Sequence, residues 1–191
     1  VTKGAAARVG QIAASEYTKM QELGGLVGRC LMAAVLAGAI AWGWKLRLLQ
    51  LPGLILTPLV FWYFLRVPNT TFFEIPLEWA NLGRLPVTTM SLGIFLVGLV
   101  TVGQLSFWGN YLPHVFPVHL RGTGESFAAN IGGRMIGTSA AAVTSLVAGW
   151  MPYESAPLKF SSAAAIVGTT ICLIGLVAGL FLPEPREAID D

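Results

Sequence analysis

Four stretches of this sequence are long runs of apolar residues that contain little charge. About 20 such residues cross a bilayer as a helix, and only helices and closed barrels satisfy their backbone hydrogen bonds in lipid. Strict polar and apolar alternation over strand-length stretches is absent, so a transmembrane barrel is excluded. The sequence therefore predicts an all-α integral membrane protein, with spans at about 23–42, 85–112, 126–150 and 161–182.

A fifth, shorter apolar stretch at 48–65 contains Pro52 and Pro58, and it spans a bilayer if it is tilted or kinked at those prolines. We therefore expect about five transmembrane helices in one bundle. The expected helices cover approximately residues 9–43, 47–66, 86–112, 124–150 and 161–182 of a bundle that comprises 1–191. Because the chain begins at Val1 without a methionine, in sequence of helical character, we expect a C-terminal fragment of a longer protein.

Composition excludes several classes of function. Only 12% of the residues are charged, whereas about 25% are charged in a typical soluble domain. The net charge of +2 leaves no basic excess to neutralise phosphates, so nucleic acid is not an expected partner. Cys30 and Cys172 lie far apart in apolar segments without metal-ligand spacing, and we interpret both as packing residues. We expect no metal and no cofactor.

Two segments outside the apolar runs carry expectations of their own. The connection at 66–84 is expected to be a polar loop, with its aromatic residues, among them Phe72, Phe73 and Trp79, at the membrane interface. The tail at 183–191 is polar and ends the last helix at its prolines.

The start of the first helix allows two registers. If the helix enters the membrane near Val9, then Glu16, Lys19 and Glu22 lie at membrane depth and must face protein or water, and this is the register that we expect. The alternative is an extramembrane extension in which these residues form local ion pairs three residues apart.

Further along the same helix, two kinds of residue lie on opposite faces. Each helical residue advances by about 100°, which places Glu22 and Arg29 roughly opposite Gly24 and Gly28. Small residues four apart permit the close approach of a neighbouring helix. We therefore expect Glu22 and Arg29 to face protein rather than lipid, as candidate proton-coupling or gating groups.

A polar and aromatic stripe follows in the segment that ends at residue 112. Thr101, Gln104, Trp108 and Tyr111 lie within about 90° of one another on a helix. An amide flanked by aromatic rings can orient and desolvate a hydroxylated or carboxylated solute. The alternative is a set of interfacial aromatic residues with one interhelical hydrogen bond. We select Gln104, Trp108 and Tyr111 as candidate binding residues.

The segment at 124–149 carries the densest polar face, which comprises Ser126, Asn130, Gly133, Arg134, Gly137 and Thr144. Arg134 is expected near the middle of the bilayer, where an arginine requires a carboxylate, backbone carbonyls or water. Its guanidinium suits a carboxylate or a phosphate, so Asn130 and Arg134 are candidate binding residues. The alternative for Arg134 is a permanent ion pair, with Glu22 or with a helix outside this chain.

The loop before this segment contains His114, His119 and Arg121. The spacing of the two histidines is not that of metal ligands on one helix face, so no metal site is expected. Arg121 is a candidate gating group. Glu125, in the first turn of the helix, is favoured there by the helix dipole and is interpreted as a capping or gate contact.

Residues 109–137, GNYLPHVFPVHLRGTGESFAANIGGRMIG, resemble the junction of the tenth and eleventh helices of major facilitator superfamily transporters, with Phe116 and Pro117 followed by Arg-Gly-Thr-Gly at 121–124. The resemblance extends over the whole chain, from the eighth helix to the twelfth, and implies that 43–47, 113–123 and the tail are cytoplasmic. One departure concerns residues 37–47, AGAIAWGWKLR. They lack the acid of the family motif and retain only Lys45 and Arg47.

The resemblance implies a function: proton-coupled secondary transport of a small polar solute, an organic acid or a sugar-like metabolite, by alternating access. The implied partners are the solute, protons, the lipid bilayer and the N-terminal half of the transporter, in the cytoplasmic (inner) membrane. A facilitator or a nontransporting sensor of the same fold is the alternative. A membrane-embedded enzyme ranks lower, because the sequence offers no converging nucleophile, base or metal ligands.

Overall fold

The computed structural model describes residues 3–76, 78 and 84–183, with side chains from residue 11 onward. Trp79 and the tail beyond residue 183, both of which carry sequence-based expectations, lie outside the described residues. Seven α-helices lie in the described part: α1 (Lys3–Ala37), α2 (Trp42–Tyr63), α3 (Thr89–Thr101), α4 (Leu105–Val115), α5 (Arg121–Phe127), α6 (Arg134–Trp150) and α7 (Ala156–Gly179). Two strands, β1 (Thr71–Pro76) and β2 (Arg84–Thr88), form an antiparallel hairpin.

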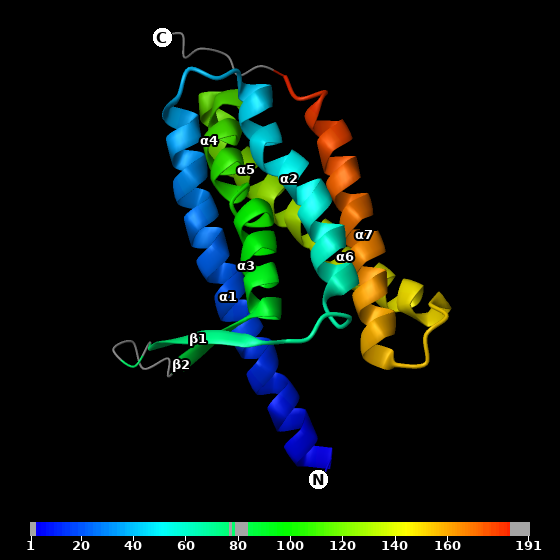
Figure 1. The fold of residues 1–191 in the computed structure, drawn as a ribbon. Helices are drawn as coiled ribbons and strands as arrows, with labels where there is room; N and C mark the ends of the chain where they lie inside the picture. Colours follow the sequence, from blue (N-terminus) through cyan, green and yellow to red (C-terminus); the bar gives the residue numbers. More distant parts are fainter. Residues whose placement is uncertain (1–2, 77, 79–83, 184–191) are drawn as a thin grey trace.

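Five helical segments of the described chain are long and apolar enough to cross a membrane, which confirms the predicted number. They are Gln11–Ala37, Trp42–Tyr63, Thr89–Val115, Val118–Trp150 and Ala156–Gly179. The helices run roughly alongside one another, and the hairpin lies across one end of the bundle (Figure 1). We call this end the hairpin end. The far end is the end at which α2 begins and α7 finishes.

The closest helix contact joins α1 to α3. A Cβ atom at Gly24 would overlap the backbone oxygen of Phe95, and one at Gly28 would overlap that of Leu99. The partner helix contributes Gly98, where a Cβ atom would overlap the backbone of α1. The small-residue face of α1 therefore does pack against a neighbouring helix, as its spacing predicts, and the two backbones touch.

The candidate span in α1 begins at Gln11, close to the expected entry near Val9. The ring centroids of Tyr17 and Phe64, the residue after α2, lie 5.5 Å apart, and the Tyr17 hydroxyl lies 3.8 Å from the sulfur of Met90 in the first turn of α3. Tyr17 is therefore level with the hairpin ends of α2 and α3. The preceding part of α1 projects past the hairpin (Figure 1). Packing of α1 against the ends of α2 and α3 thus begins at about Tyr17, and Glu16 lies at the edge of the bundle.

The connection at 66–84, expected to be a loop, contains most of the hairpin. Leu85 and Val87 of β2 are buried against Met20 of α1, so one face of the hairpin belongs to the core. The prolines in both strands obscure the alternating pattern that signals strands in a sequence. The core contact attaches the hairpin to α1.

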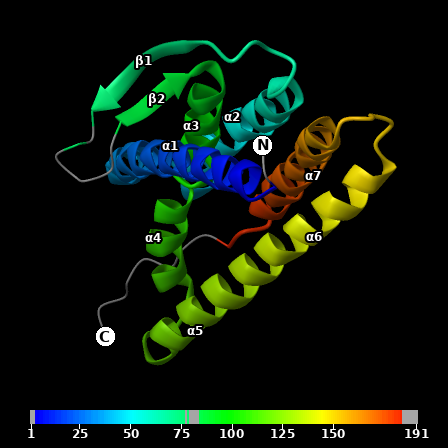
Figure 2. The same cartoon turned by 90° about the horizontal axis from the view of Figure 1, so that it is seen from below.

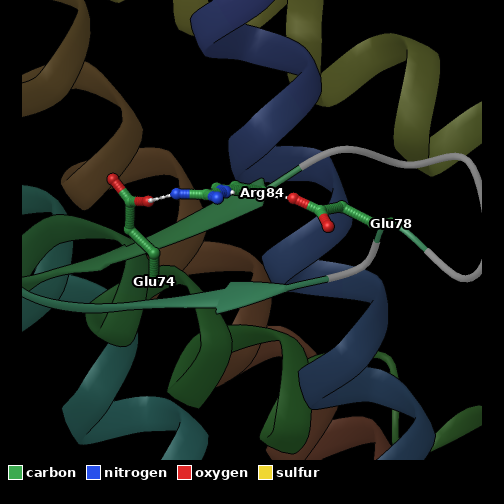
Figure 3. A network of polar contacts seen from close by, with 3 residues as sticks. All are labelled: Glu74, Glu78 and Arg84. Atoms are coloured by element: carbon green, nitrogen blue, oxygen red, sulfur yellow. Dashed lines mark hydrogen bonds and ion pairs between the residues drawn. The ribbon is translucent and has the colours of Figure 1, made fainter.

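On the outer face of the hairpin, Arg84 pairs with Glu74 at 3.8 Å and with Glu78 at 3.1 Å (Figure 3). All three side chains are more than half exposed, and exposed pairs of this kind contribute about 1 kcal/mol or less. The apolar contact with α1, rather than this ion-pair network, therefore holds the hairpin in place.

Polar side chains join α2 to α7 along their length. The Gln50 amide donates to the Gly175 carbonyl at 3.2 Å, near the far end. At the hairpin end, the guanidinium of Arg66, three residues after α2, donates to Ser162 of α7 at 3.0 Å and to Tyr153, which precedes α7, at 2.9 Å. Hydrogen bonds at both ends make α2 and α7 a cross-linked pair.

We expect Gly28→Ala to destabilise the protein, because the new methyl group requires the backbones of α1 and α3 to separate. Overpacking of this kind costs on the order of 1–3 kcal/mol. The change is measured as a lower midpoint of thermal unfolding of the purified protein in detergent. Gly109→Ala is the matched control, since a Cβ atom there meets nothing within 4 Å. Equal midpoints for the two variants would contradict the contact.

Candidate functional site

The helix formed by residues 121–150 is the least enclosed of the five. Only 6% of its most apolar stretch is buried, against 22% to 33% in the other four segments. Figure 2 shows α5 and α6 as one long rod at the side of the bundle, with α7 alongside α6. The Cβ positions at Gly132, Gly133 and Gly137 meet no atom within 4 Å. One long face of this helix is therefore open.

A π-helical turn interrupts this helix at Ala128–Gly133, between α5 and α6. The amide of Arg134 bonds the carbonyls of Asn130 and Ile131, and the Asn130 side chain donates to the Ser126 carbonyl at 2.9 Å. Single π turns inside α-helices are frequent at functional sites. This turn bears Asn130 and leads directly into Arg134.

Arg134 lies near the middle of this segment, 13 residues after Arg121 and 16 before Trp150. At 1.5 Å per residue, both ends are about 20 Å or more away. Its side chain is exposed. Among the described residues it forms no ion pair or hydrogen bond. The expected alternative, a pair with Glu22, is therefore not formed in this structure.

The predicted single helix over 86–112 is in fact two helices, because the chain turns at 102–104. The amides of Leu105 and Ser106 bond carbonyls three residues earlier, and the Gln104 amide donates to the Val100 carbonyl at 2.8 Å. Gly103, within the turn, packs against Gly28. The close contact with α1 thus coincides with the break, and the Gln104 donor is used locally.

Trp108 and Tyr111 lie in an aromatic cluster at the far end. Tyr111 is 2% exposed and stacks on Phe107 with ring centroids 5.3 Å apart. Its hydroxyl donates to the Pro183 carbonyl at 2.5 Å. Trp108 is half-buried and meets the same two rings edge-on. The structure places Tyr111 in the apolar core rather than on an open face, whereas Gln104 and Trp108 remain partly accessible.

The candidate coupling and gating residues lie on two helices. Glu22 is exposed and Arg29 is half-buried on α1, turned away from the face that packs on α3. Arg121 is exposed and Glu125 half-buried in α5. None of the four has an ion pair or hydrogen bond within the described part of the chain. The structure therefore does not join them into a network.

No group of three or more potential metal ligands is present among the residues that the structure describes. Comparison with family models, with curated proteins and with solved structures finds no match for this chain. By length and composition, five helical segments are able to cross a membrane, which is the pattern of a multi-pass membrane protein.

The turn at 102–104 and the π turn are only weakly indicated by the sequence. The turn at 102–104 coincides with Gly103 inside an otherwise continuous apolar run, and the π turn ends at the pair Gly132 and Gly133. Glycine lowers helix stability, yet a single glycine does not distinguish a break from a packing contact. The structure supplies that distinction.

We expect cysteines at positions 130 and 134 to react with a membrane-impermeant thiol reagent when the protein is in its membrane. The background carries Cys30→Ala and Cys172→Ala, and Met135→Cys is the control. Met135 lies at the same depth but is turned by about 100° toward the groove between α6 and α7. Thiol labelling measured by mass shift is expected for Asn130→Cys and Arg134→Cys only. Faster labelling at position 135 would place water on the other side of the helix.

Proposed function

We propose that this protein forms one helix bundle of a secondary transporter, and that the open face of α5 and α6 lines the path of a small polar solute. The observation that carries the proposal is the exposed guanidinium of Arg134 near the middle of an apolar segment, where no described residue pairs with it. An arginine at the centre of a bilayer costs on the order of 2.5–3.5 kcal/mol or more unless it meets water or a polar partner. A solute-filled cavity supplies both.

The chemistry of this face favours an organic acid or a sugar-like metabolite. The planar guanidinium of Arg134 presents paired donors that match a carboxylate. The side-chain amide of Asn130, one turn away, is able to accept hydrogen bonds from hydroxyl groups and to donate hydrogen bonds to them. A second helix bundle is the proposed opposite wall, because the open face has no cover from the described residues.

Two interrupted helices support alternating access. The turn between α3 and α4 and the π turn between α5 and α6 lie in different spans, and each carries a candidate binding residue or leads into one. Transporters commonly build midplane sites from discontinuous helices. In contrast, α2 and α7 are cross-linked by hydrogen bonds and serve as a fixed support in this proposal.

Glu22 is the proposed proton carrier, because it is an exposed carboxylate within a candidate span. A facilitator or a nontransporting sensor of the same fold is the second candidate. An enzyme is not proposed, since the site has no nucleophile paired with a base. The proposed location is the cytoplasmic (inner) membrane.

We expect Arg134→Ala to weaken solute binding without loss of folded protein. Losing hydrogen bonds to a charged group costs about 1.5–3 kcal/mol, or roughly 10- to 100-fold in apparent affinity. The measurement is uptake of labelled small carboxylates and hexoses by proteoliposomes containing the transport-competent protein. Arg134→Lys is expected to retain part of the activity, and Met135→Ala is the control at the same depth. Normal uptake by Arg134→Ala would favour a structural role.

We expect Glu22→Gln to abolish accumulation that is driven by a pH gradient while exchange of internal and external solute continues. A permanently neutral side chain cannot bind and release the coupled proton, yet it leaves the solute face intact. The two assays are run on the same proteoliposomes. Equal loss in both assays would assign Glu22 to binding, and accumulation as in the unaltered protein would assign the coupled proton to another residue. A failure of the unaltered protein itself to accumulate solute would favour a facilitator.

A further inference from the structure

A groove with a volume of about 520 Å³ lies between the last turns of α2 and the middle of α7. Its wall includes Leu59, Trp62 and Tyr63 of α2 and Ile166 and Leu173 of α7. These five side chains are large and apolar, yet all of them are exposed. No described residue of α5 or α6 lines this groove, so it is separate from the open face of those helices.

The hydroxyl groups that α7 contributes to this groove already have acceptors. Thr169 donates to the Ala165 carbonyl at 2.6 Å, and Thr170 donates to the Ile166 carbonyl at 2.9 Å. None of the described residues in the wall carries a charge. At 1.5 Å per residue, the wall extends along α7 for about 12 Å, from Ala165 to Leu173. A hydrocarbon chain therefore suits the groove better than a polar solute, which would lose its hydrogen bonds to water there.

The guanidinium of Arg66 lies at the hairpin end of the groove, against two aromatic rings. Its central carbon is 4.3 Å from the ring of Trp62, which is a wall residue, and 5.3 Å from the ring of Tyr153. The guanidinium also donates to the Ser162 hydroxyl at 3.0 Å. Because Ser162 precedes Ile166 by about one helical turn, the positive charge lies about one turn beyond the apolar wall.

Arg66 is able to bind a further acceptor. Its guanidinium donates to the Trp62 carbonyl and to the hydroxyls of Tyr153 and Ser162, and these three bonds leave other N–H groups of the guanidinium unused. Arg66 is only half-buried, and no carboxylate among the described residues pairs with it. The rings of Trp62 and Tyr153 hold the guanidinium in place by cation–π contacts.

The charges at this end of the groove favour one anionic group. The bordering segments at 64–70 and 151–162 carry Arg66, Glu154 and Lys159 as their charged residues. Two cations and one carboxylate leave a net charge of about +1. Lys159 is half-buried, and its helical angle falls within the range of the wall residues of α7, one turn nearer the hairpin end than Ser162. A single phosphodiester complements this charge.

We propose that the groove binds one phospholipid of net negative charge from the leaflet at the hairpin end, with its phosphate at Arg66 and one acyl chain between α2 and α7. The planar guanidinium matches a phosphate, and Trp and Tyr rings are typical of the depth of lipid headgroups. The offset of about one turn between charge and apolar wall fits a molecule with a charged head and an apolar chain. This site goes beyond solute transport and does not depend on it.

The first test compares two phospholipids with the same acyl chains. The purified full protein, in a neutral glycoside detergent, is titrated with dioleoylphosphatidylglycerol or with dioleoylphosphatidylcholine, and native mass spectrometry counts the bound lipid. We expect one phosphatidylglycerol molecule to bind with higher apparent affinity than phosphatidylcholine. We also expect it to raise the midpoint of thermal unfolding saturably.

Variants then test the two parts of the site. Arg66→Gln is expected to weaken phosphatidylglycerol binding about tenfold or more, and Arg66→Lys less, because the lysine keeps the charge. Arg84→Gln, which removes the same charge from the outer face of the hairpin, is the matched control. Thr169→Phe fills the groove and is expected to prevent binding of the chain. Ile174→Phe, at an exposed position of α7 outside the wall, is its control.

Three results overturn the proposal: equal binding of the two lipids by the unaltered protein, unchanged phosphatidylglycerol binding by Arg66→Gln, or unchanged binding by Thr169→Phe. The first result would mean that lipid only coats the apolar surface. Because Arg66 also joins α2 to α7, thermal unfolding in detergent alone checks that each variant is folded. The comparison of the two lipids on the unaltered protein needs no variant and decides between headgroup recognition and coating by itself.

Discussion

A backbone that crosses a membrane must satisfy its own hydrogen bonds, and this protein meets that requirement even where its helices are irregular. At the turn between α3 and α4, two amides bond carbonyls three residues earlier, and the Gln104 side chain serves the Val100 carbonyl. At the π turn, the Asn130 side chain serves the Ser126 carbonyl. Gln104 and Asn130, two of the candidate binding residues, thus also support the backbone at an interruption. Binding of the proposed solute would therefore be coupled to helix geometry through the same side chains.

The helices differ in how firmly they are held. The contact between the backbones of α1 and α3 tolerates no side chain at Gly24 or Gly28, and α2 and α7 are joined by hydrogen bonds at both ends. The helix at 121–150 has far fewer buried residues. A firm scaffold beside one weakly held helix suits the proposed alternating access, because a movement of that helix would break few contacts.

Sequence patterns predicted part of this structure well. Apolar length predicts five spanning helices, and the spacing of Gly24 and Gly28 predicts a helix contact, because both depend on local periodicity alone. The hairpin was not predictable in this way, since its prolines mask the strand pattern and its stability depends on Met20, more than 60 residues earlier. The polar face at Asn130 and Arg134 was predictable from helical angles. Burial of Tyr111 was not, because it arises from three other segments, at Met32, Leu46 and Pro183.

Strand β2 of the hairpin leads directly into α3, with no residues between them. β2 ends at Thr88, and that residue caps α3 through reciprocal bonds with Ser91. Because no linker separates the strand from the helix, a tilt of the hairpin either tilts α3 or breaks the Thr88 cap. Such a cap contributes about 1 kcal/mol to the stability of the protein. Because α3 touches α1 backbone to backbone, such a tilt is passed on to α1 as well. A displacement of the exposed strand β1 would therefore be transmitted through β2 and the Thr88 cap to α3 and to the turn at residues 102–104.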